Sequence, residues 1–153
     1  MHGFYFASAQ QVFDLDTQQD HLAPHTTSNL LYKGAAAGNA RTVWEGMIYV
    51  APQAMQTDGF QTNRNLVLGA GAEVNALPGL EILADDVRCS HGASIGRLDE
   101  DELFYLQTRG IPRREAEQLV IEGFFGEVVE QVPVEALRLE LKKLLIARFK
   151  LAV

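Results

Sequence analysis

The pattern of apolar and polar residues divides the chain into two parts. From residue 3 to about residue 90, short runs rich in β-branched, aromatic and leucine residues alternate with Gly, Pro, Asn and Asp, and helical periodicity is almost absent. Beyond Gly96, apolar residues recur at spacings of three and four, which indicates helices. We therefore expect short strands at residues 4–7, 11–15, 29–33, 42–50, 59–61, 66–68, 73–75, 80–83 and 87–90, followed by helices.

The connections between the expected strands leave the architecture open. Only Asp58-Gly59 has the two-residue form that is typical of tight hairpins. Turn residues that recur at short intervals among short strands suit a sandwich, a barrel or a β-solenoid, and the pattern alone does not choose among them. The small-residue segments 34–38 and 69–72 fit either tight corners, at which the coils of a solenoid stack, or flexible loops.

Capping signals set the expected helix boundaries. Asp99 is a suitable N-cap and Glu102 completes the pattern of a capping box, so a first helix should run to about residue 109 and end before Gly110. Pro112 suits the first turn of a second helix, and Pro133 begins a third. The apolar stripes of these two helices most simply face the core; they comprise Ala116, Leu119, Val120, Phe124 and Val128, and then Leu137, Leu141, Leu144 and Leu145. Because three short helices have limited apolar surface to share, the alternative is that part of Phe124-Phe125 or of the last helix is left for a partner.

Composition describes an ordinary globular chain. Its 153 residues are 47% hydrophobic and 22% charged, enough for one domain with or without a small appendage. The net charge of −7 counts against a nucleic-acid partner, because phosphate neutralisation needs clustered Lys and Arg. The single cysteine excludes an internal disulfide and suits a reducing compartment. Neither a signal peptide nor a membrane span is evident, so we expect a cytoplasmic protein without a membrane partner.

Cys89 and His91 are the strongest candidates for a functional site. They are two residues apart, so on an extended strand both side chains leave the same face. Thiolate and imidazole suit iron, zinc or copper(I), but two ligands are too few to close a tetrahedral site. A metal held here would need further ligands from a partner. From spacing alone, the alternative is that Cys89 is a small buried side chain and His91 an ordinary surface residue.

A hydrolase is a second hypothesis. His21 and His25 lie near Ser28 in the sequence, and either Ser28 or Cys89 would be the nucleophile. The sequence puts no base and orienting acid beside either nucleophile, and it contains no Gly-x-Ser-x-Gly motif. It also lacks the phosphate-binding motif Gly-x-x-x-x-Gly-Lys-Ser/Thr, so ATP hydrolysis would belong to a partner. A third hypothesis is a purely structural β-solenoid interaction protein whose thiol is buried and inert.

Several segments together carry a more specific signal. Residues 85–92 read Asp-Asp-Val-Arg-Cys-Ser-His-Gly and follow Pro-Gly-Leu-Glu-Ile at 78–82. Residues 61–68 read Gln-Thr-Asn-Arg-Asn-Leu-Val-Leu, residues 41–50 are centred on Gly46, and residues 21–28 contain histidine and serine. From about residue 21 to residue 125, the chain resembles the SufB/SufD family of iron–sulfur cluster assembly proteins, and its SufD members in particular. Val67 stands where the family usually has Leu.

The resemblance implies a fold and a role. It implies a right-handed parallel β-helix over residues 1–97, followed by a C-terminal helical domain over residues 98–153. It also implies a non-catalytic scaffold subunit of the iron–sulfur cluster assembly (SUF) complex, which pairs with a SufB-like paralogue through the β-helix. A SufC-like ABC ATPase would dock on the helical part; the residues we assign to this contact are Phe104, Tyr105, Arg109, Phe124 and Phe125.

The resemblance also gives Cys89 and His91 a role. By position they correspond to family residues at the SufB interface, where they would share iron or a nascent iron–sulfur cluster with the partner. Asp85 and Asp86 would form hydrogen bonds with nearby groups and orient His91. An ordinary turn or a solvated acidic face explains the two aspartates at least as well. Family members are considerably longer, so we expect a C-terminal fragment. Because a cut solenoid exposes strand edges, a homodimer through the β-helix is a further expectation.

Overall fold

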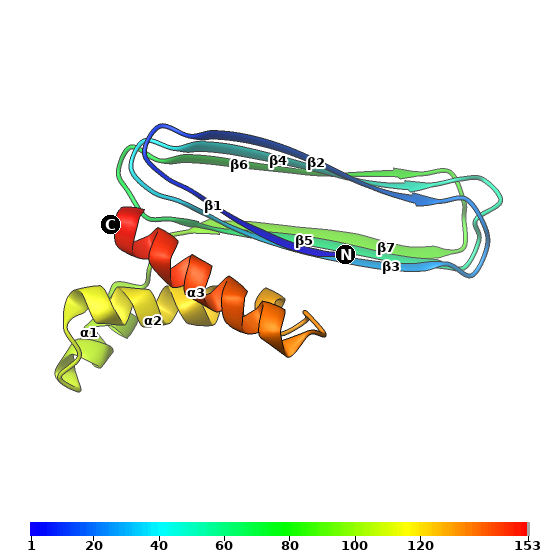
Figure 1. The fold of residues 1–153 in the computed structure, drawn as a ribbon. Helices are drawn as coiled ribbons and strands as arrows, with labels where there is room; N and C mark the ends of the chain where they lie inside the picture. The colour runs from blue at the N-terminus through cyan, green and yellow to red at the C-terminus, as the bar shows by residue number, and fades with distance from the viewer. Residues whose placement is uncertain (153) are drawn as a thin grey trace.

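The strands form two parallel sheets that face each other (Figure 1). The structure is a computed structural model that describes residues 1–152. One sheet has the order β1-β3-β5-β7 and the other β2-β4-β6, so the chain changes sheet after every strand. The strands are β1 (His2–Ala7), β2 (Val12–His21), β3 (Thr27–Ala36), β4 (Arg41–Val50), β5 (Thr57–Val67), β6 (Glu73–Ile82) and β7 (Val87–Gly96). This arrangement is a parallel β-helix, which confirms the expected fold and decides among the three architectures.

Alternating side chains fill the space between the two sheets. In β4, Trp44 and Ile48 point inward and are fully buried, whereas Arg41 and Glu45 on the outer face are exposed. The strands of each sheet pair in parallel without a bulge, so equivalent inward positions stack from one coil to the next. The alternation of inward and outward side chains along β4 therefore builds the core of the solenoid.

Polar residues inside the solenoid explain where the strand predictions were wrong. Residues 59–61 and 66–67 belong to the single strand β5, because Asn63 and Asn65 between the two segments point inward and are buried, and residue 68 follows the end of the strand. The amide of Asn65 donates to Asn63, and its oxygen accepts a hydrogen bond of 2.6 Å from the Tyr5 hydroxyl. Likewise, segments 73–75 and 80–83 merge almost entirely into β6, where Pro78 is tolerated on the edge strand of its sheet. Strand β2 continues to His21, well beyond the predicted 11–15.

The second small-residue segment (69–72) and the end of the first (37–38) form tight corners that stack on each other. Gly38 has a φ of +66°, a conformation that residues with a side chain rarely adopt. On the next coil, a Cβ on Gly69 would lie 2.9 Å from the backbone nitrogen of Gly38. Coils can therefore stack this closely only without side chains at these positions. The corner interpretation is confirmed for 69–72, whereas residues 34–36 lie inside β3.

The helices are α1 (Glu100–Thr108), α2 (Arg113–Val129) and α3 (Glu135–Ala152), close to the predicted boundaries. Helices α2 and α3 lie against the outer face of the β1-β3-β5-β7 sheet, and α1 packs on α2 (Figure 1). Asp99 caps α1 as predicted, because its carboxylate accepts a 2.8 Å hydrogen bond from the backbone of Asp101. Gly110, with a φ of +85°, follows the end of that helix. None of the helices within residues 1–152 combines the length and the apolar composition needed to cross a membrane.

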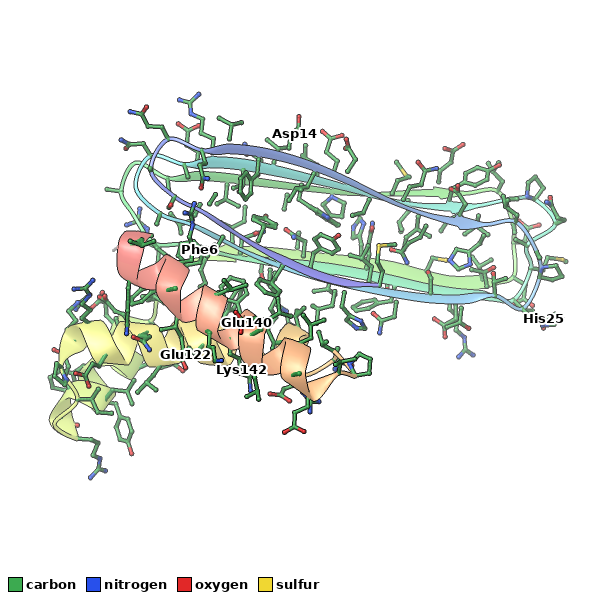
Figure 2. All side chains as sticks on the ribbon, viewed as in Figure 1. Phe6, Asp14, His25, Glu122, Glu140 and Lys142 are labelled. Carbon is green, nitrogen blue, oxygen red and sulfur yellow. The ribbon has the colours of Figure 1, made fainter. Side chains whose placement is uncertain are left out.

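A second core joins the helices to the sheet. Phe6 points from β1 toward the helices (Figure 2), and its ring centroid lies 6.4 Å from that of the fully buried Phe125 of α2. Phe4 packs on the same ring at 5.4 Å. Helix α3 contributes Leu145 and Phe149 to this cluster. The solenoid and the helices therefore share one apolar contact, and the side chains that form it are unavailable to any partner.

The helical stripes are buried only in part. Ala116 and Val128 of α2 are buried, but Leu119 is 48% exposed. On α3, Leu137 and Leu144 are 49% and 58% exposed. Helix α3 packs through Leu145 and Phe149, so Leu145 of the predicted stripe lies in the core, whereas Leu137 and Leu144 lie on a side that no element of residues 1–152 covers.

Candidate functional site

Cys89 and His91 both face the interior of the solenoid, on the last strand of their sheet. In the register of β5 and β7, Cys89 pairs with Gly59 and His91 pairs with Gln61. Gln61 points inward, since its side-chain amide donates to backbone oxygens of β4 and β6 in the opposite sheet, at 3.2 and 3.0 Å. Paired residues in a parallel ladder share a face, so His91 and Cys89 point inward too. Within residues 1–152 no strand pairs beyond β7, so this inner face lies open at the end of the stack.

The two side chains differ in their surroundings. His91 is exposed, whereas Cys89 is half-buried and packs against the apolar cluster that contains Ile48 and Val50. Burial raises the pKa of the Cys89 thiol above its ordinary value, a hydrogen bond from the Gly59 backbone opposes this, and the Asp58 carboxylate adds to the increase. The thiol therefore carries its proton at neutral pH. A metal ion that binds the sulfur has to displace that proton.

This chain offers two donors at the site and no complete metal cage. Among residues 1–152, no group of three or more His, Cys, Asp or Glu side chains is close enough to hold a metal ion. Asp85 and Asp86 lie in the exposed bend before β7. The backbone carbonyl of Asp86 accepts a hydrogen bond from Gln56, which is a turn contact and not a contact with His91. The structure thus gives the two aspartates a place in the corner of the last coil.

His21 and Ser28, which the hydrolase hypothesis needs, do lie together. The His21 Nε2 atom is 2.7 Å from the Ser28 hydroxyl, inside the solenoid. The other ring nitrogen is 2.7 Å from the hydroxyl of Thr26, in the place where hydrolases position a carboxylate. The amide of Gln19 also donates to the Ser28 oxygen, at 2.6 Å. His25 is exposed at a corner with a φ of +61° (Figure 2). The arrangement is a buried polar ladder with a base beside a hydroxyl but without the orienting acid.

The five residues assigned to partner docking fall into two groups. On α1, Phe104 and Tyr105 are 67% and 57% exposed, and the guanidinium of Arg109 lies 5.1 Å from the Tyr105 ring centroid. On α2, Phe125 is fully buried and Phe124 is half-buried, with its ring edge-on to that of Phe125 at 5.0 Å. The predicted docking role of Phe125 therefore has to be corrected, because this ring fills the core. The exposed aromatic surface belongs to α1.

A family model decides what kind of chain this is. The model described as SUF system FeS cluster assembly, SufBD core domain, matches residues 1–124. The chain belongs to the SufBD family. The match covers the whole solenoid, both donors on β7, helix α1 and most of α2.

Individual relatives agree with this assignment. An iron–sulfur cluster assembly SufBD family protein of Mycobacterium tuberculosis is 42% identical in an alignment 144 residues long, which covers 89% of this chain and 36% of that relative. The iron–sulfur cluster assembly protein SufD of Escherichia coli is 43% identical over 128 residues, 84% of this chain and 30% of that protein. SufD of Bacillus subtilis is 36% identical over 132 residues, with 86% and 30% covered. The chain thus spans about a third of the length of the curated relatives it matches.

Two features of this SufBD-family chain escaped the sequence analysis. One is the position of Gly59 beside the Cys89 sulfur. The sequence analysis noted Asp58-Gly59 only as a possible hairpin turn, which was wrong, because both residues lie inside β5. Only the register of β5 with β7 brings Gly59 and Cys89 together. The other is an exposed leucine row on α3, in which Leu137, Leu144 and Leu151 are 49%, 58% and 83% exposed. Their spacing of seven residues was available in the sequence and would have separated this row from the buried face.

Proposed function

We propose that the chain is part of a scaffold subunit for iron–sulfur cluster assembly, in which Cys89 and His91 offer a sulfur and a nitrogen ligand to iron or to a nascent cluster. The observation that carries the proposal is that both donors face the same open end of the solenoid, on its last strand. Two donors do not complete a four-coordinate site, so the remaining ligands come from a partner placed against that end. We propose a SufB-like member of the same family as this partner, with a second copy of the chain as the alternative occupant.

In this proposal the chain supplies two ligands, and the Cys89 thiol releases a proton. The neutral thiol of Cys89 loses its proton when the sulfur bonds to iron, so cluster binding becomes stronger as the pH rises. His91 binds through a neutral ring nitrogen, and its exposed position lets a partner bring the other ligands to it. No catalytic step is asked of the protein, because the iron and sulfur are its cargo.

The helices provide the second contact of the proposal. We assign docking of a SufC-like ATPase to the exposed α1 surface of Phe104, Tyr105 and Arg109, beside a groove of about 410 Å³ that Asp101 and Leu106 also line. Exposed aromatic and arginine side chains are typical of protein interfaces. The test compares capture of the ATPase by two variants: one in which Phe104 and Tyr105 are both changed to Ala, and the control Lys143→Met on the exposed surface of α3. Capture that is lost in the first variant and retained in the second supports the assignment. Equal capture by both variants excludes it.

The test of the site uses the full-length protein with its paralogue and ATPase. Cys89→Ala and His91→Ala should each reduce the iron and acid-labile sulfide bound per complex by about tenfold or more, because each removes a ligand that nothing nearby replaces. Ser90→Ala is the matched control, since Ser90 pairs with Phe60 and so lies on the outer face between the two donors. A cluster yield equal to that of the unmodified complex in both donor variants removes the proposed site.

The hydrolase remains the alternative function, on the single observation of the 2.7 Å contact between His21 and Ser28. It requires that purified protein hydrolyses a simple activated ester and that Ser28→Ala abolishes this activity. The scaffold proposal expects no turnover above that of the Ser28→Ala variant.

A further inference from the structure

Three strands converge on the inner face of Gly59. A Cβ placed on this glycine would lie 3.2 Å from the Cys89 sulfur of β7, 3.3 Å from a methyl group of Ile48 on β4, and 3.4 Å from Nε2 of His21 at the end of β2. The Cys89 sulfur is therefore directed from the last coil toward the preceding coil, which contains Gly59. The place where any other residue would carry a side chain is a recess that these three groups line.

The backbone does not need a glycine at this position. The glycines of residues 1–152 with a positive φ are Gly38 and Gly110, so Gly59 has a backbone conformation that any residue can adopt. A glycine inside a strand is destabilising relative to alanine, since it loses more conformational freedom on folding. Space, and not conformation, is what glycine provides here, and the atom that occupies the nearest part of that space is the Cys89 sulfur.

We infer that Gly59 is a positioning residue for Cys89: the missing side chain makes the recess into which the thiol turns. The inference rests on the proposed function in taking Cys89 as a cluster ligand. Gly59 sets the direction from which the sulfur approaches its ligand and keeps it partly shielded between the sheets, whereas His91 stays exposed. Filling the recess displaces the sulfur toward the open end of the solenoid.

Alkylation of the thiol in the native chain measures this displacement directly. Cys89 is the only cysteine, so the rate of reaction with iodoacetamide reports on one side chain. In Gly59→Ala, the new methyl group forces the sulfur outward by a few tenths of an ångström, and we expect a rate about threefold or more above that of the unmodified chain at the same pH. Circular dichroism melts establish that the variant is folded.

Gly92 supplies the matched control. It lies on β7 next to His91, and the nearest atom to a Cβ there would be the Thr62 hydroxyl oxygen at 3.9 Å, an ordinary contact. Gly92→Ala should leave the alkylation rate unchanged. Equal rates in Gly59→Ala and Gly92→Ala overturn the inference. If Gly59→Ala does not fold, a small and a bulky thiol reagent are compared on the native and the urea-unfolded chain. A recessed thiol slows the bulky reagent more, and equal slowing of both overturns the inference.

The functional consequence separates this inference from the proposed function. In the full-length complex, Gly59→Ala should lower bound iron and sulfide, and Gly92→Ala should not. If Cys89→Ala loses the cluster but Gly59→Ala retains all of it, the positioning role is refuted and the proposed function stands. If Cys89→Ala retains the cluster, the proposed function is refuted, and the alkylation rates alone then decide whether Gly59 positions the thiol.

Discussion

Lys33 ties the solenoid to the helices, and replacing it with Met tests how much this link contributes. The side chain leaves the outer face of β3 and is only 4% exposed. Its Nζ atom donates to the backbone oxygen of Phe124 at 2.6 Å, lies 2.6 Å from the Glu127 carboxylate, and sits 4.7 Å from the centroid of the Phe124 ring. Lys33→Met keeps the apolar stem in the contact and removes only the charged group.

The structure sets the size of the expected effect. A hydrogen bond from a charged donor contributes about 1.5–3 kcal/mol, and a cation over an aromatic ring about 0.5–2 kcal/mol. Against these gains stands the desolvation of the Lys33 ammonium, which is several kcal/mol for a buried ion. The Glu127 side chain is 48% exposed, so solvent screens part of the attraction. We expect Lys33→Met to lower the free energy of unfolding by about 1–2 kcal/mol. For a chain of this size, that is a fall in Tm of about 2–8 °C.

The pH dependence of the free energy of unfolding shows how much of this effect comes from the ion pair between Lys33 and Glu127. Lys33 holds the pKa of Glu127 below its ordinary value of 4.5. A carboxylate whose pKa is lowered by folding contributes stability above its unfolded pKa, and this contribution is lost as the pH falls through the folded pKa. The difference between the two proteins should therefore be constant above about pH 4.5 and shrink below it.

Urea unfolding followed by circular dichroism measures both quantities. The control is Lys143→Met, because Lys143 is 75% exposed and its Nζ lies 3.6 Å from Glu140, a surface contact that should contribute less than about 0.5 kcal/mol. A Lys33→Met variant as stable as the unmodified chain at pH 7 would mean that desolvation cancels the contacts, and would refute this reasoning.

Three further outcomes follow from burial. Phe125→Ala should lower the free energy of unfolding by about 3–5 kcal/mol because the ring fills the shared core, whereas Phe104→Ala should change it by less than about 0.5 kcal/mol; similar urea midpoints for both would contradict the packing described. Burial lowers the pKa of His21 below 6.5, so the unfolded chain takes up the proton first and stability should decline as the pH falls below 6.5; His21→Asn should flatten this decline, and an unchanged slope would count against it. Burial raises the pKa of Cys89, so its alkylation rate should still be rising at pH 9.0, and Asp58→Asn should increase the rate at a given pH; a plateau below pH 9.0 would be inconsistent with the buried thiol.

Local rules predicted the elements well wherever a residue's own preference matched its place in the fold. Strand β4 was predicted almost whole because β-branched, aromatic and other apolar residues dominate it, and α1 was predicted because Asp99 and Gly110 mark its two ends. The rules failed where the solenoid overrides local preference. Polar residues such as Asn63 suggested a turn in the sequence. In the structure the backbone of β5 pairs with β3 and β7 through this position, and the inward-facing Asn63 side chain accepts a hydrogen bond from Asn65, so the strand is continuous.

The candidate site shows the same division between local and long-range information. That Cys89 and His91 share a face follows from their spacing alone, and the register of β7 agrees with it. Which face they share depends on the opposite sheet and on the coil below, where Gly59 leaves room for the sulfur. The inward direction changes how a partner has to approach. A protein lying on the outer face of β7 would meet Arg88 and Ser90 and reach neither donor, so the partner that completes a metal site has to meet the solenoid end-on, along the free edges of β6 and β7.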